Sequence, residues 1–75
     1  MSEAYKKLIR AIKREMFKNG MNIKQTAEAA GCHRVNLSQY LNLRTSMPAE
    51  LLIRLIDRFD IDVCAEIGIP HEKKE

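Results

Sequence analysis

Apolar residues recur every three or four positions near the beginning of the chain, which is the period of an amphipathic helix. They are Tyr5, Leu8, Ile9, Ile12 and Met16. The hydroxyl of Ser2 is placed to cap this helix, because it can accept a hydrogen bond from an N–H of the first turn. Asn19-Gly20 follows, and glycine readily adopts the left-handed conformation found after a helix. The pattern therefore predicts a first helix between Ser2 and Asn19.

Two shorter helices are predicted next. Asn22 is the expected cap of the second helix, and Gln25 stands three residues later, as in a capping box. This helix ends at Gly31, because glycine takes a positive φ without steric cost. A third helix begins around His33 or the next residue and continues to about residue 41. Two short helices joined by a tight glycine turn are typical of a helix-turn-helix, here over about 22–42.

A fourth helix is predicted after the loop "NLRTSMP". Pro48 is tolerated in the first turn of a helix, where its missing N–H costs nothing. We expect this helix to span about Pro48 to Phe59. Its inward-facing apolar residues are Leu51, Leu52, Leu55, Ile56 and Phe59.

The end of the chain alternates strictly between apolar and other residues. The apolar positions are Ile61, Val63, Ala65, Ile67 and Ile69. A period of two favours a β-strand. A one-turn helix, capped by Asp62 and ended by Gly68, is the alternative. A single strand needs a partner, and the nearest partner is its copy in a second subunit. We therefore expect a homodimer with residues 60–70 as the dimerisation segment and those five apolar residues at its interface.

The composition predicts one domain over residues 1–75, without repeats or low-complexity segments. The first 15 residues are charged throughout and do not resemble a signal peptide. No apolar run approaches the roughly 20 residues of a membrane span. We therefore expect a cytoplasmic protein in which the two cysteines, Cys32 and Cys64, are free thiols.

The net charge of +3 is unevenly distributed. The first two-thirds of the chain are basic, whereas residues 48–70 carry more Asp and Glu than Lys and Arg. This division suggests a polyanion-binding face and a different surface elsewhere, although an ordinary solvated mixture of charges remains the alternative. The basic first helix also fits a membrane surface or a partner groove. We favour a surface helix with its apolar stripe in the core.

The predicted third helix has an unusual outward face. On a helical wheel, Leu37, Tyr40 and Leu41 point inward. The outward side chains are Val35, Ser38, Gln39 and Asn42, with Arg34 and Asn36 on the flanks. This face has no acidic residue and a single cation, whereas a solubilising face usually mixes Lys with Glu. Gln pairs with adenine, Arg pairs with guanine and Val contacts a thymine methyl group, so this set suits base-edge reading in the major groove.

Residues 21–59, "MNIKQTAEAAGCHRVNLSQYLNLRTSMPAELLIRLIDRF", resemble the helix-turn-helix domain of the Cro and phage-repressor (XRE-like) family, including its Ala27, Gly31 and Leu37 pattern. The segment "QTAEAAG" is similar to that of phage activators of the CII type. The ending "DIDVCAEIGI" resembles helix-turn-helix antitoxins and Cro-like proteins that dimerise through a C-terminal strand. The resemblance implies a mainly α, lambda-repressor-like domain of four helices with a C-terminal strand or short fifth helix.

The resemblance also implies two groups of DNA-contacting residues. Base contacts in the family come from the start of the third helix and from one turn later, which here gives Arg34, Val35, Ser38 and Gln39. Phosphate contacts come from the beginning of the second helix and from around the end of the third. These match Asn22, Lys24, Gln25, Asn36, Asn42, Arg44 and Thr45. Val35 and the capping position His33 depart from the residues most common in the family.

Other chemistry finds little support in the sequence. Cys32, His33, Cys64 and His71 lack the spacing of a zinc site, so we expect no metal and no cofactor. No arrangement of nucleophile, base and orienting group suggests an enzyme. The leading hypothesis is a homodimeric repressor that binds near-palindromic double-stranded DNA. The alternative is an antitoxin-like or adaptor protein whose helix-turn-helix binds a protein partner. A membrane-surface protein is a weaker third reading.

Overall fold

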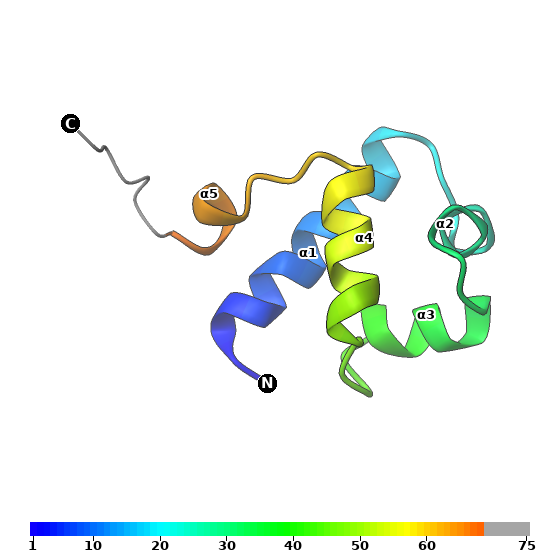
Figure 1. Ribbon diagram of the computed structural model, residues 1–75, viewed down its shortest axis with the longest axis horizontal. Coiled ribbons are helices and arrows are strands. Elements are labelled where there is room, and N and C mark those ends of the chain that lie inside the picture. Colours follow the sequence, from blue (N-terminus) through cyan, green and yellow to red (C-terminus); the bar gives the residue numbers. More distant parts are fainter. Residues whose placement is uncertain (69–75) are drawn as a thin grey trace.

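The computed structural model describes residues 1–68 and is mainly α-helical (Figure 1). Within these residues the chain forms five helices and no strand. The helices are α1 (Glu3–Lys18), α2 (Ile23–Ala30), α3 (Arg34–Leu41), α4 (Ala49–Arg58) and α5 (Val63–Ile67). The first four lie where the hydrophobic pattern predicts them.

Local capping residues explain where α1 and α2 begin. The Tyr5 backbone N–H donates to Ser2 Oγ over 3.1 Å at the start of α1. At α2, the Gln25 N–H donates to Asn22 Oδ1 over 2.7 Å, and the Asn22 N–H donates to Gln25 Oε1 over 3.0 Å. These bonds complete the capping box, because each residue satisfies an N–H that the helix leaves without a partner.

The connection between α2 and α3 is short and tightly bonded. Gly31 ends α2 with a φ of 77°, in the left-handed region. The next N–H, that of Cys32, donates to the Ala27 carbonyl over 3.0 Å. His33 is the N-cap of α3, and its Nδ1 accepts a 3.2 Å hydrogen bond from the Val35 N–H. His33 therefore caps α3 with its side chain, at a position where Ser, Thr, Asp or Asn is usual.

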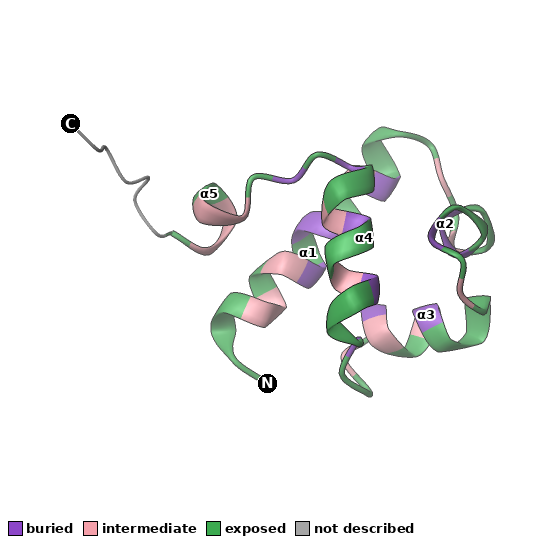
Figure 2. Ribbon diagram, in the orientation of Figure 1, coloured by how far each residue is buried: buried purple, intermediate pink, exposed green. Residues whose placement is uncertain are grey.

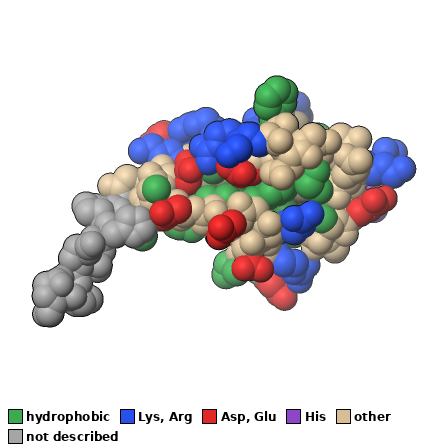
Figure 3. Space-filling view, turned by 90° about the horizontal axis from the view of Figure 1, so that it is seen from above, with side chains coloured by type: hydrophobic (Ala, Val, Ile, Leu, Met, Phe, Trp, Pro, Cys, Tyr) green, Lys and Arg blue, Asp and Glu red, His purple; other side chains and the backbone are tan. Residues whose placement is uncertain are grey.

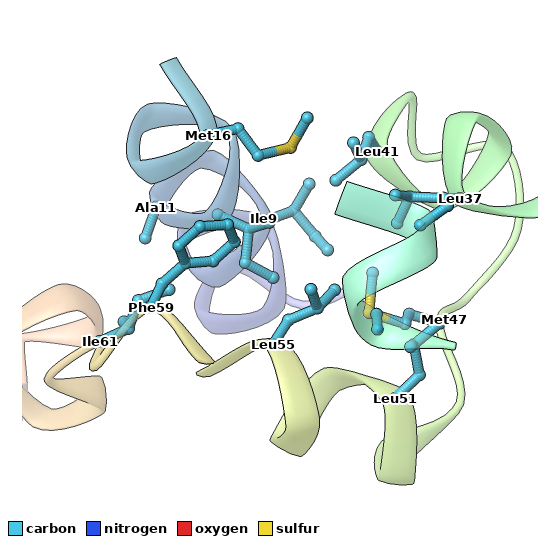
Figure 4. Packing of buried hydrophobic residues seen from close by; sticks show 13 residues of the cluster. Ile9, Ala11, Met16, Leu37, Leu41, Met47, Leu51, Leu55, Phe59 and Ile61 are labelled. Atoms are coloured by element: carbon cyan, nitrogen blue, oxygen red, sulfur yellow. The ribbon is translucent and has the colours of Figure 1, made fainter. Parts of the chain in front are cut away.

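The core forms where α1, α3 and α4 meet. Figure 1 shows α4 crossing α1, with α2 and α3 together at one end of the molecule and α5 toward the other. The purple segments of Figure 2 face this meeting point. In Figure 4, Leu55 of α4 and Phe59, the residue that follows α4, point toward Ile9 of α1, and Met16 extends toward Leu41 of α3. Ile12, Leu37 and Leu55 are fully buried, as the helical spacing of apolar residues predicts.

The prediction of a strand over residues 61–69 is wrong within the described residues. The chain instead forms the short helix that was the alternative interpretation. Asp62 Oδ1 accepts a 3.2 Å hydrogen bond from the Ala65 N–H, and Gly68 ends the helix with a φ of 84°. Two local signals thus outweigh the period-two pattern. Ile69, also expected in the strand, lies outside the described residues.

Burial also separates the residues expected at the dimer interface. Ile61 is only 9% exposed and belongs to the core of its own chain, which leaves little of its side chain for the predicted intersubunit contact. Val63 and Ile67 are four residues apart on one side of α5 and half-buried, whereas Ala65 is exposed. The alternation of apolar residues reflects one residue buried before the helix and two on a single helical face.

An ion pair fastens α5 to α1. Arg14 Nη2 lies 2.6 Å from Glu66 Oε2, and Arg14 Nη1 donates to Glu66 Oε1 over 3.2 Å. The hydrogen bond from Arg14 lowers the pKa of the Glu66 carboxyl group, and partial desolvation opposes this shift. Glu66 of α5 therefore lies against one flank of the basic first helix.

Candidate nucleic-acid interface

A concavity of about 940 Å³ opens between α2, α3 and the loop that follows α3. It is lined by Met16, Asn22, Ile23, Lys24, Arg34, Val35, Ser38, Gln39, Asn42 and Arg44. All four residues predicted to contact bases are in this set, and so are four of the seven predicted to contact phosphate. The turn at Gly31 brings them together, because it directs the beginnings of α2 and α3 toward one surface.

The outward face of α3 is available to a ligand. Arg34, Val35 and Gln39 are exposed, and Ser38 is half-buried. Val35 is 52% exposed although its side chain is apolar and branched. It therefore forgoes the stabilisation that burial in the core would give. Leu37 and Leu41 hold the opposite face of the helix in the core. The helix therefore presents its polar side to solvent from a fixed position on the core.

The charge of the concavity is entirely positive. Its charged lining residues are Lys24, Arg34 and Arg44, and no acidic side chain from residues 1–68 lines it. All three cations are exposed, and none has a carboxylate within 4.0 Å among residues 1–68. Their charges are not neutralised by the protein, so this surface suits an anionic ligand.

Three residues predicted to contact phosphate do not line the concavity. Gln25, Asn36 and Thr45 are exposed but lie outside its lining. Gln25 also uses its side-chain oxygen in the capping box, which leaves only its amide NH₂ group for a ligand. Asn22 likewise uses its side-chain oxygen in the capping box, which leaves its amide NH₂ group for a ligand.

The loop after α3 is held by backbone and side-chain hydrogen bonds. The Arg44 N–H donates to the Gln39 carbonyl over 2.9 Å, so the chain folds back over the end of α3. The Met47 N–H donates to the Tyr5 hydroxyl over 2.8 Å. Leu43 has a φ of 61°, a left-handed conformation that costs free energy for a residue with a side chain. The packing of Leu43 against the core offsets this cost. It also fixes the position of the next residue, Arg44, at the surface.

Two lining residues were not anticipated by the sequence reasoning. Met16 and Ile23 form part of the wall of the concavity, although both occupy inward positions of their helices. Met16 extends toward Leu41 in Figure 4. Their place in the wall could have been expected from their position at the edge of the apolar stripe, near the end of α1 and the beginning of α2. They supply an apolar floor between the polar residues of the two helices.

The described residues offer little support for a reactive thiol, a metal site or a membrane span. Burial raises the pKa of the Cys32 thiol, and the charge of Arg54 partly opposes the shift. Protonation disfavours nucleophilic attack by this sulfur, because the thiolate is the reactive form. Within residues 1–68, no three His, Cys, Asp or Glu side chains are grouped to hold a metal ion. No helix in this range is both long and apolar enough to cross a membrane.

Comparison of the chain with protein-family models, with curated proteins and with solved structures gave no match in any of the three searches. The interpretation of this surface therefore depends on its own geometry and charge.

Proposed function

We propose that this protein is a sequence-specific, double-stranded DNA-binding transcriptional regulator of the Cro-like repressor type. The observation that carries the proposal is the shared concavity, which combines the outward face of α3 with three unpaired cations and no acidic residue. In this proposal, residues 22–42 act as a helix-turn-helix and α3 enters the major groove.

The two kinds of side chain have separate roles. Arg34, Val35, Ser38 and Gln39 contact base edges, because they project from the solvent-facing side of α3. Two cations border them, Lys24 on α2 and Arg44 in the loop after α3. In these positions they bind phosphate and hold the duplex in register. Gln39 pairs with adenine and Arg34 with guanine, and the methyl groups of Val35 contact thymine.

A second subunit completes the site in this proposal. A helix of eight residues reads only a few base pairs, whereas two copies of α3 about 34 Å apart read both halves of a near-palindromic operator. The half-buried side chains of Val63 and Ile67, which share one side of α5, are the surface that we propose for self-association, and Ala65 lies on the other side of that helix. Sedimentation of the protein at micromolar concentration tests this step separately from DNA binding.

A protein partner is the second candidate function, and one observation on α4 favours it. Ile53 is 64% exposed, and Glu50 and Asp57 lie three residues before and four residues after it on the same face. An exposed apolar side chain with carboxylates on either side suits a contact with a basic protein, although Glu50 is also paired with Arg54 over 3.2 Å. Under this alternative, the acidic surface rather than α3 carries the function.

Selection of binding sites from a random duplex pool, followed by a salt titration, distinguishes the two candidates. A DNA-binding regulator enriches a defined sequence, and its affinity falls steeply as salt increases because bound phosphates release counterions. Gln39→Ala then relaxes the enriched sequence at one position. Absence of enrichment together with absence of salt-dependent binding would refute the DNA-binding proposal and favour the protein-partner alternative.

A further inference from the structure

A row of cations on α1 stands outside the concavity just described. Lys6, Arg10, Lys13 and Phe17 follow one another at intervals of four, three and four residues. At ~100° per residue this spacing places all four side chains in an arc of about 60° on one side of the helix. We call these four residues the α1 ridge. It is about 16 Å long, from the rise of 1.5 Å per residue.

The ridge is on the flank of α1 that adjoins the concavity. Met16 lines the concavity and is the immediate neighbour of Phe17 and the i+3 neighbour of Lys13. Arg14, four residues after Arg10, borders the ridge on the side away from Met16, and it is paired there with Glu66 of α5. Within the described residues Glu66 is engaged by Arg14 and by no ridge residue, so the ridge keeps its own cations beside those of the concavity.

Arg10, Lys13 and Phe17 of the ridge are exposed, and Lys6 is half-buried. Arg10 and Lys13 have no carboxylate within 4.0 Å among the described residues, while Lys6 has Glu3 at 3.8 Å. Phe17 is 87% exposed, more than any other large apolar side chain in residues 1–68. Figure 3 shows Lys and Arg side chains gathered along one long edge of the molecule. Two cations without a carboxylate partner, next to an exposed ring, form a binding surface for a polyanion that also offers apolar faces.

We infer that the α1 ridge binds the sugar-phosphate backbone of the same DNA duplex, beyond the base pairs that α3 contacts. This inference rests on the proposed DNA-binding function and extends its footprint. Arg10 and Lys13 bind successive phosphates, since phosphates of one strand are spaced more closely than the length of the ridge. Phe17, at the end nearest the concavity, packs on deoxyribose. The complex thus gains phosphate contacts that no base sequence specifies.

An anionic membrane is the other surface that attracts a basic helix, and the burial of α1 argues against it. Membrane-bound helices insert a broad apolar face among the acyl chains. In α1, that face is committed to the core, where Ile9, Ile12 and Met16 are buried. Phe17 alone would be left to enter the bilayer. A duplex needs only the outward cations, and these lie beside the concavity.

The test compares three single substitutions that each remove one positive charge from α1. Arg10→Gln and Lys13→Gln alter the ridge, and Lys7→Gln is the matched control. Lys7 is exposed and without a carboxylate within 4.0 Å in the described part of the chain, but it lies on the flank away from Met16. Affinity for a random-sequence duplex of about 30 base pairs is measured over a range of salt concentrations. Thermal melting verifies that each variant is folded.

Each ridge variant should reduce the salt dependence of log K by about 0.9, the value of one lost phosphate contact, while Lys7→Gln leaves it unchanged. A different result is that the wild-type protein shows a steep fall of log K with salt while the ridge variants behave like Lys7→Gln. That result would overturn the inference but leave the DNA-binding function intact. A wild-type protein without salt-dependent binding would refute the function itself. Vesicles of phosphatidylglycerol and phosphatidylcholine form the third arm. Loss of vesicle binding in the ridge variants, without a change in the DNA slope, would assign the ridge to lipid and overturn the inference.

Discussion

The phenolic oxygen of Tyr5, in the first turn of α1, accepts a 2.8 Å hydrogen bond from the backbone N–H of Met47, just before α4. Forty-two positions separate the two residues in the sequence. Met47 is 5% exposed, so its N–H has little access to water. The hydroxyl of Tyr5 therefore fixes the end of the loop that also carries Arg44.

Tyr5→Phe should lower the free energy of unfolding by about 1–2 kcal/mol, because it removes the acceptor and leaves a buried N–H without a partner. The ring itself is kept, so packing in the core changes little. Thermal or urea unfolding measures the loss. Met47→Leu is the control, because it changes the neighbouring side chain but keeps the backbone N–H. Equal stability of Tyr5→Phe and the wild-type protein would show that water satisfies this N–H.

The hydrophobic pattern and the caps were sufficient to predict α1 to α4, because both are local signals. Gly31 illustrates this, since its positive φ follows from residue type. Leu43 and Asp60 also have positive φ, at 61° and 53°, but neither is a glycine. The conformation of Leu43 depends on its packing against the core, which is set by residues distant in the sequence. Such positions are not predictable from local propensity.

The C-terminal segment shows a conflict between two local signals. Alternating apolar residues favoured a strand, while Asp62 and Gly68 favoured a short helix. Burial of Ile61 in the core and the pairing of Glu66 with Arg14 are tertiary contacts that stabilise the helix. The candidate site followed a similar course. The polar lining on α3 was predictable from its helical wheel, and that of Asn22, Lys24 and Arg44 only from the family resemblance. The contribution of Met16 required knowledge of how α1 and α3 pack.

Ala27 tests the close packing of the two helices that frame the concavity. It is 2% exposed, and its carbonyl accepts the hydrogen bond from the Cys32 N–H in the turn. Ala27→Leu should lower the free energy of unfolding by about 1–3 kcal/mol, because three additional carbons have no space in the core. The neighbouring Ala29→Leu is the matched control, since Ala29 is exposed. Similar melting temperatures for the two variants would contradict the tight contact at Ala27.

Gln39 and Arg44 test the division between base and phosphate contacts in the proposed function. Gln39→Ala should cost about 1–3 kcal/mol on the selected operator and relax preference at one base pair. Arg44→Ala should weaken binding to every sequence alike and reduce the salt slope by about one. Both side chains are exposed, so neither substitution should change the melting temperature greatly. The assignment of roles fails if Arg44→Ala changes the preferred sequence or if Gln39→Ala leaves it intact.

Arg14 and Glu66 make the attachment of α5 sensitive to acid. Arg14 lowers the pKa of Glu66 in the folded protein, so the folded state binds this proton less readily than the unfolded chain does. Their interaction therefore contributes stability at pH values above the ordinary glutamate pKa, and this contribution disappears as the pH falls through the lowered pKa. Below that point Glu66 is protonated in both states and the pair adds nothing.

Arg14→Gln should consequently be less stable than the wild-type protein at neutral pH, and the two melting temperatures should converge under acidic conditions. Arg14 also lies 3.5 Å from Glu15, but the shorter contact to Glu66 is the one that joins two helices. Arg10→Gln is the matched control, because it removes the same charge from α1 without breaking an ion pair among residues 1–68. Its difference from wild type should show no comparable pH dependence. A difference for Arg14→Gln that persists unchanged through the titration of Glu66 would mean that packing, and not the ion pair, holds α5 on α1.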